Sequence, residues 1–172
     1  MKISKLAAFF LFAFASLPVF ADVYDYPSRL EDIVQKLPAL ESVKCKFKQE
    51  KTVQNLAKPL ISGGDFEFVK DKGVYFHTTY PIEASVDYTG KNYKQINDIV
   101  NAISTKKYSR LEKEFNFYHT GTTDNWTLGM KPKEESAAAD YISSITVKGS
   151  NYISGIEILQ TNGNKTVIWF DK

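Results

Sequence analysis

The chain has 172 residues, 43% of them hydrophobic and 14% aromatic, with 22 lysines and arginines against 20 aspartates and glutamates. Lys2 and Lys5 belong to the leader described below. Without them the chain has 20 cations and 20 anions, so it lacks the excess of positive charge that is typical of nucleic-acid-binding proteins. The single cysteine, Cys45, excludes an internal disulfide, so the fold must close through its own apolar core.

The first 21 residues have the organisation of a secretory signal peptide. A basic start precedes an apolar run over residues 6–14, and Val19-Phe20-Ala21 forms a small-x-small cleavage site. The apolar run is shorter than the roughly 20 residues that a membrane-spanning helix needs. We therefore expect residues 1–21 to be a signal peptide and residues 22–172 to be one exported, soluble periplasmic domain.

A short amphipathic helix is expected near the start of this domain. Ser28 precedes Glu31 by three positions, as in a capping box, and the helix is expected to end before Pro38. The apolar residues on one face of this helix are Leu30, Ile33, Val34 and Leu37.

Five consecutive strands are expected next. The first alternates strictly between apolar residues and lysines, which is typical of a strand with one buried face. Gly63-Gly64 predicts a bulge in the second strand, and Thr89-Gly90 predicts a hairpin turn between the fourth and the fifth. The expected strands cover residues 43–53, 60–69, 74–79, 83–88 and 92–94.

The hydrophobic period then changes. Apolar residues at 96, 99, 100 and 103 have helical spacing, and Tyr108, Leu111 and Phe115 suggest a second helix or turn. Strands resume afterwards, with a hairpin at Asn162-Gly163 and a short helix over residues 136–141. The later strands are expected at residues 115–119, 126–130, 144–148, 153–161 and 166–170. The pattern predicts an α+β fold that is mainly β: one curved antiparallel sheet, or half-open β-barrel, covered by short helices.

Catalytic chemistry is not expected. A nucleophile would have to combine Cys45 with His77 or His119, but an inward-facing cysteine usually behaves as a small hydrophobe. The two histidines lack metal-ligand spacing, so we predict no metal, no cofactor and no enzyme activity. The alternative, a hydrolase that acts on a lipid-like substrate through Cys45, would lose its activity in a Cys45→Ala variant.

Several segments resemble the outer-membrane lipoprotein carrier (LolA-like) family, in a short divergent branch. The resemblance lies in Phe47-Lys48-Gln49, in residues 62–68, in residues 75–81, in Tyr88-Thr89-Gly90-Lys91-Asn92-Tyr93 and in residues 126–132. It implies a half-open barrel of about eleven antiparallel strands whose cavity carries acyl chains across the periplasm toward the outer membrane. The implied partners are an acyl lipid or lipoprotein, an inner-membrane donor and an outer-membrane acceptor, with a monomer as the expected state.

Two departures from the family bear on the cargo. Carriers of lipoproteins have an Arg-Pro after the second strand whose arginine latches the lid, and this chain has Lys70-Asp71-Lys72-Gly73 there. The chain also ends at Lys172, soon after the last hairpin. Another acyl-bearing or polyene-like lipid would therefore fit equally well.

A competing hypothesis is a periplasmic protein-interaction module with a filled core and no lipid cargo.

For the carrier, strand alternation and family position together predict the binding residues. The lid is expected at Ile99, Val100 and Ile103. The cavity is expected at Val43, Cys45, Phe47, Phe66, Phe68, Val74, Phe76, Val86 and Tyr88.

Overall fold

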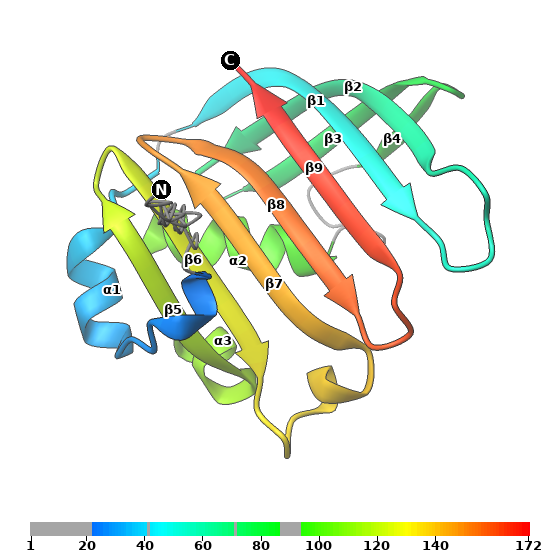
Figure 1. The fold of residues 1–172 in the computed structure, drawn as a ribbon. Helices are drawn as coiled ribbons and strands as arrows, with labels where there is room; N and C mark the ends of the chain where they lie inside the picture. The colour runs from blue at the N-terminus through cyan, green and yellow to red at the C-terminus, as the bar shows by residue number, and fades with distance from the viewer. Residues whose placement is uncertain (1–21, 41, 71, 87–93) are drawn as a thin grey trace, which may run out of the picture.

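In the computed structural model, residues 22–40, 42–70, 72–86 and 94–172 are described, so the predicted signal peptide lies outside the described residues. These residues form one nine-stranded sheet in the order β4-β3-β2-β1-β9-β8-β7-β6-β5, and every neighbouring pair is antiparallel (Figure 1). The strands are β1 (Val43–Thr52), β2 (Leu60–Val69), β3 (Gly73–Tyr80), β4 (Ala84–Val86), β5 (Phe115–Thr122), β6 (Asn125–Pro132), β7 (Ile142–Gly149), β8 (Ile153–Gln160) and β9 (Lys165–Asp171).

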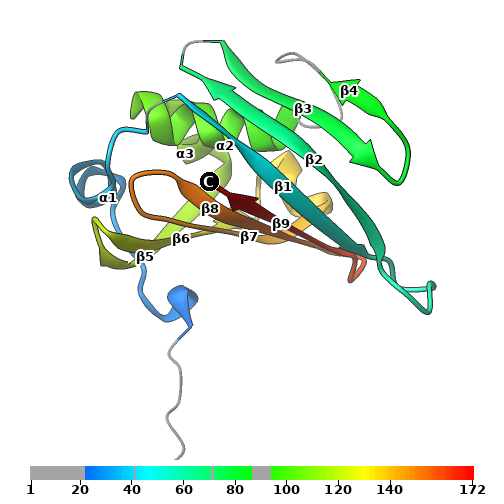
Figure 2. The same ribbon diagram turned by 90° about the horizontal axis from the view of Figure 1, so that it is seen from above.

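Helices cover one face of this open sheet, which confirms the predicted fold class. Figure 2 shows α2 and α3 on the side toward which β1 to β4 curl, with α1 beside β5 and η1 on the opposite side. We call the face toward α2 the inner face and the other the outer face. The helices are η1 (Val23–Asp25), α1 (Leu30–Lys36), α2 (Lys94–Thr105), α3 (Ser109–Glu114) and η3 (Ala137–Asp140).

The pairing of β1 with β9 joins two halves of the sheet that are far apart in sequence. Phe47 of β1 lies opposite Phe170 of β9, and both are buried on the inner face. Lysines occupy the alternate positions of β1, where Lys44 and Lys46 pair with Glu67 and Asp65 across β2. The alternation of β1 therefore separates an apolar inner face from a charged outer face, as the sequence predicts.

The last hairpin is confirmed, but the bulge lies on the neighbouring strand instead of on β2. β2 pairs with β1 without a shift, whereas its register against β3 shifts at Gly63 and Gly64, where Thr79 of β3 is the extra residue. Gly163 adopts a φ of +80° in the turn between β8 and β9, a conformation that favours glycine.

The capping-box prediction at the first helix is wrong. The helix begins at Leu30 with Arg29 as its N-cap, and no side chain caps it. The Ser28 hydroxyl instead donates to the Tyr26 carbonyl, and the Ser28 N–H donates to the Phe117 carbonyl of β5. Ser28 is thus held along the edge of the sheet, and this tertiary contact overrides the local cap.

Some boundaries also differ from the sequence prediction. Within the described residues the fourth strand begins at Ala84 instead of Glu83 and is described to Val86, and Lys94, expected in a fifth strand, begins α2. The predicted turn at Thr89-Gly90 lies outside the described residues. The short helix near residue 137 is a 3-10 helix. The described part of the chain contains nine strands instead of the eleven that the family resemblance implies.

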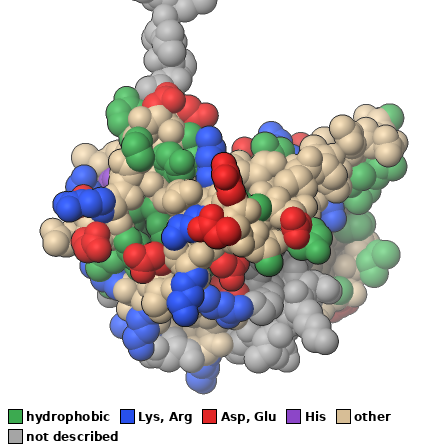
Figure 3. Space-filling view, turned by 90° about the horizontal axis from the view of Figure 1, so that it is seen from below, with side chains coloured by type: hydrophobic (Ala, Val, Ile, Leu, Met, Phe, Trp, Pro, Cys, Tyr) green, Lys and Arg blue, Asp and Glu red, His purple; other side chains and the backbone are tan. Residues whose placement is uncertain are grey.

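Charges of both signs mix on the surface. Figure 3 shows Lys and Arg interspersed with Asp and Glu at the lower end of the molecule, without a dominant sign. Among the described residues, no helix is both long and apolar enough to cross a membrane.

Candidate functional site

The inner face of β1, β2 and β3 brings most of the predicted cavity residues together. Cys45 lies opposite Phe66, which lies opposite Phe76 on β3. Val43, Phe68 and Val74 form a second row across the same strands. The register therefore places seven predicted residues on one face: Val43, Cys45, Phe47, Phe66, Phe68, Val74 and Phe76.

The last two predicted cavity residues are only partly described. The backbone of Val86 pairs with that of Phe76, so β4 continues the same row, but the Val86 side chain lies outside the described residues. Tyr88 lies outside them altogether.

Aromatic rings fill the centre of the inner face. The ring centroids of Phe66 and Phe170 are 4.4 Å apart, those of Phe66 and Phe76 are 4.9 Å apart, and those of Phe47 and Phe76 are 5.0 Å apart. Tilted and edge-on pairs at such distances are favourable for aromatic rings. The result is an apolar surface spanning β3, β2, β1 and β9.

Helix α2 lies on this surface with its predicted lid residues inward. Ile99, Val100 and Ile103 are all at least 98% buried and belong to the same core as the phenylalanines. The 3.6-residue period places them on one stripe of the helix, while Asn97, Asp98 and Asn101 occupy less buried positions.

Three sets of polar contacts tie α2 to its surroundings. The Asn97 Oδ1 atom accepts from the Val74 N–H at 3.2 Å. Arg110 on α3 donates to Asp98 at 3.2 Å, and Lys106 donates to the Val34 carbonyl at 3.0 Å. Apolar packing of the buried stripe of α2 also holds the helix on the sheet.

Two spaces open beneath the helices. The larger has a volume of about 280 Å³ and lies between α2, α3, η3 and β7. Its mouth carries Asp98, Arg110 and Glu114, and its interior is apolar. Of the predicted residues, only Ile99 lines it. The remaining lining residues are Leu111, Phe115, Ala137, Ala138, Tyr141, Ile142 and Ile145.

The smaller space lies among the predicted cavity residues themselves. It measures about 10 Å³ and lies between Val43, Phe66, Phe68, Val100 and Phe170. A volume of roughly 10–15 Å³ is needed to hold even one water molecule. Between these described residues, α2 and the sheet therefore leave room for about one water molecule.

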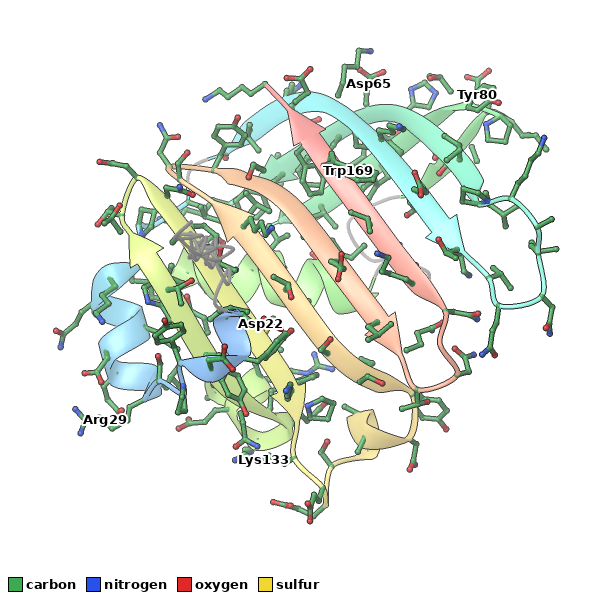
Figure 4. All side chains as sticks on the ribbon, in the orientation of Figure 1. Asp22, Arg29, Asp65, Tyr80, Lys133 and Trp169 are labelled. Atoms are coloured by element: carbon green, nitrogen blue, oxygen red, sulfur yellow. The ribbon has the colours of Figure 1, made fainter. Side chains whose placement is uncertain are left out.

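The outer face carries a third, broader depression of about 1100 Å³. Hydroxyl groups and both signs of charge line it, including Thr146, Glu157 and Lys165, with Tyr24 and Trp169 among the aromatic members. Figure 4 shows Asp22 and Trp169 over different strands of this face. Its lining mixes polar, charged and apolar side chains, unlike the apolar inner face.

The cysteine is poorly suited to nucleophilic chemistry. Burial, with the nearby Asp171 carboxylate, raises the pKa of the half-buried Cys45 thiol to about 11. His77 lies 3.2 Å from Glu83, whereas His119 lies on β5 at the far edge of the sheet. Burial, with the nearby Lys36 ammonium, lowers the pKa of His119. Among the described residues, no group of His, Cys, Asp and Glu could hold a metal ion.

The candidate residues that sequence reasoning missed lie in the second half of the sheet. Ile168 and Phe170 of β9 and Ile156 of β8 continue the inner face. The alternation within these predicted strands could have identified their inward positions. The space lined by Leu111 and Ile145 carried no local signal, because it depends on how α3 packs against β7.

Comparisons with known proteins establish no family for the chain. No protein-family model matches it. No curated protein matches it either. Among solved structures, a crystal structure of a LolA superfamily protein from Nitrosomonas europaea aligns with a TM-score of 0.40 and 8% sequence identity, covering 83% of this chain and 90% of that chain. At this score and identity the family resemblance seen in the sequence stays a prediction.

Proposed function

We propose that the chain is a periplasmic carrier that binds the acyl chains of a lipid or lipoprotein between the inner face and α2, and shuttles them toward the outer membrane. The observation that carries the proposal is the apolar inner face of an open sheet covered by helices, among them the amphipathic helix α2. Donor and acceptor proteins at the two membranes are part of this proposal.

Apolar burial supplies the affinity in this account. Each methylene removed from water contributes about 0.8 kcal/mol, so ten methylenes contribute about 8 kcal/mol before the costs of ordering the chain. The 280 Å³ space falls just below the roughly 300–1,000 Å³ of typical ligand pockets. In this account α2 shifts when cargo binds, which would join this space to the narrow one beside Val100.

A second candidate is a protein-interaction module with no lipid cargo. The observation that favours it is that the space among the predicted cavity residues is only about 10 Å³, as expected for a filled core. Uptake of lipid distinguishes the two functions.

Neighbouring positions on β1 offer a matched test. Cys45 faces inward, whereas Lys46 faces outward and pairs with Asp65. We expect Cys45→Phe to weaken the binding of a fluorescent fatty acid by about tenfold or more, because the added ring occupies the space the acyl chain needs. Lys46→Phe should leave binding unchanged. Equal binding by both variants would contradict an inner-face site.

A further inference from the structure

Two turns at one end of the sheet, β1–β2 and β3–β4, carry large exposed apolar side chains. The exposed fractions are 49% for Leu56, 54% for Leu60, 60% for Tyr80 and 76% for Ile82. Isolated apolar side chains are ordinary on a protein surface, but a group of them marks a contact surface. We call these four residues the tip cluster.

Strand register places the tip cluster at one end of the sheet. Tyr80 pairs with Gly63, which is three residues beyond Leu60 on the neighbouring strand. Leu56 lies in the turn before β2, and Ile82 lies in the turn after β3. Figure 2 shows the β1–β2 turn projecting beyond the rest of the fold, and Figure 4 places Tyr80 at the margin of the sheet away from α1.

Cations accompany the tip cluster. Lys51 and Lys58 are exposed, and no Asp or Glu occurs between them or in the five residues after Lys58. Two carboxylates flank the turns in sequence: Glu50 lines the outer-face depression, and Glu83, which is exposed in the β3–β4 turn, lies 3.2 Å from His77. The local charge of the β1–β2 turn is therefore positive.

We propose that the tip cluster docks on a membrane surface that contains anionic lipid. Leu56, Leu60 and Ile82 enter the boundary between headgroups and acyl chains, and Tyr80 takes the interfacial depth that amphipathic aromatic rings prefer. The two lysines contact lipid phosphates, which attract cations near the surface. This proposal goes beyond the carrier function and does not depend on cargo binding.

The size of the patch favours a membrane over a protein partner. Even fully buried aromatic side chains contribute only roughly 150–250 Å² each. Four partly exposed side chains therefore fall well short of the about 800 Å² that a standard protein interface buries on each partner. Shallow insertion into a bilayer has no such minimum area, because each apolar side chain contributes separately.

Vesicle co-sedimentation of the mature protein tests the proposal. Vesicles of phosphatidylcholine with phosphatidylglycerol are compared with vesicles of phosphatidylcholine alone. We expect binding to the anionic vesicles that weakens as salt is added. The Leu56→Asp/Ile82→Asp double variant should lose at least about tenfold in affinity, because two inserting side chains become anionic. Lys51→Gln/Lys58→Gln should lose about tenfold or more on anionic vesicles only.

The matched control is Trp169→Ser, which removes an exposed aromatic side chain from the outer face. Its vesicle affinity should equal that of the wild type. Equal vesicle binding by the wild type and the Asp double variant would overturn the proposal, as would a wild-type protein that ignores vesicles and instead self-associates through this patch. Because the changed residues lie outside the candidate cavity, fatty-acid uptake from solution should be unchanged in the double variant, which separates failure of docking from failure of cargo binding.

Discussion

The Asn97 side chain joins the lid helix to the sheet: its Oδ1 atom accepts from the backbone N–H of Val74 at 3.2 Å. The same oxygen accepts from Asn101 Nδ2 at 2.9 Å, which fixes the orientation of the amide. One side chain on α2 therefore satisfies a backbone donor at the start of β3, and the attachment of α2 can be altered there without changing the apolar inner face.

The Asn97→Ala variant should loosen α2. Leaving the half-buried Val74 N–H without its acceptor costs about 1–3 kcal/mol of unfolding free energy. Urea denaturation should show this loss, and a fluorescent fatty acid should enter faster than in the wild type. Asn116→Ala, at an exposed position on β5, is the control that should change neither property. If both variants bind the probe at the wild-type rate, Asn97 does not hold the lid.

Gly73 should tolerate no side chain at this junction. Its φ is +109°, and an added Cβ would lie 2.5 Å from Asn97 Oδ1. We expect Gly73→Ala to destabilise the fold by about 1–3 kcal/mol through backbone strain and displacement of the amide. The comparison is Gly155→Ala, where the new Cβ would meet only a backbone oxygen at 3.4 Å. Equal unfolding midpoints for the two variants would contradict this view of the junction.

Cys45 is the only cysteine and lies on the inner face, so its alkylation reports on the site. With a pKa of about 11 against an ordinary value of 9.0, the thiol has about a hundredfold less thiolate at neutral pH, and only the thiolate reacts. Alkylation by iodoacetamide should therefore be slow and should rise about tenfold per pH unit up to this pKa. Added fatty acid should slow it further. A rate unaffected by fatty acid would place the ligand elsewhere.

The stability of the fold should depend on His119 in mild acid. Its pKa is lowered in the folded state by burial and by Lys36, so below its ordinary value of 6.5 the unfolded chain binds more protons than the folded one. Stability is therefore lost as the pH falls from about 6.5 through the lowered pKa. His119→Gln should reduce this slope in denaturation measured between about pH 7 and 5, whereas His77→Gln serves as the comparison at an outer-face site. A slope unchanged in His119→Gln would contradict the assignment.

The apolar inner face of β1 to β3 was predictable because its sequence signals are local. Strict alternation separates Cys45 and Phe47 from the intervening lysines, and the alternation of β2 likewise places Phe66 and Phe68 on the inner face. The helical period likewise identifies Ile99 and the rest of the buried stripe of α2.

Other features were not predictable, because they depend on contacts between distant segments. Phe170 joins the inner face through pairing of β9 with β1, which no local pattern encodes. Ser28 has the sequence context of a helix cap, yet its backbone bonds to Phe117 on β5. The coverage of the inner face by α2 also depends on tertiary packing, which periodicity does not report.

Native mass spectrometry of the mature protein, purified from its own periplasm without detergent and followed by organic extraction, tests the carrier function most directly. The account predicts a bound acyl lipid or lipoprotein that can be released and identified. A homogeneous cargo-free mass, together with no uptake of a fluorescent fatty acid, would contradict the carrier function and favour a protein-interaction module.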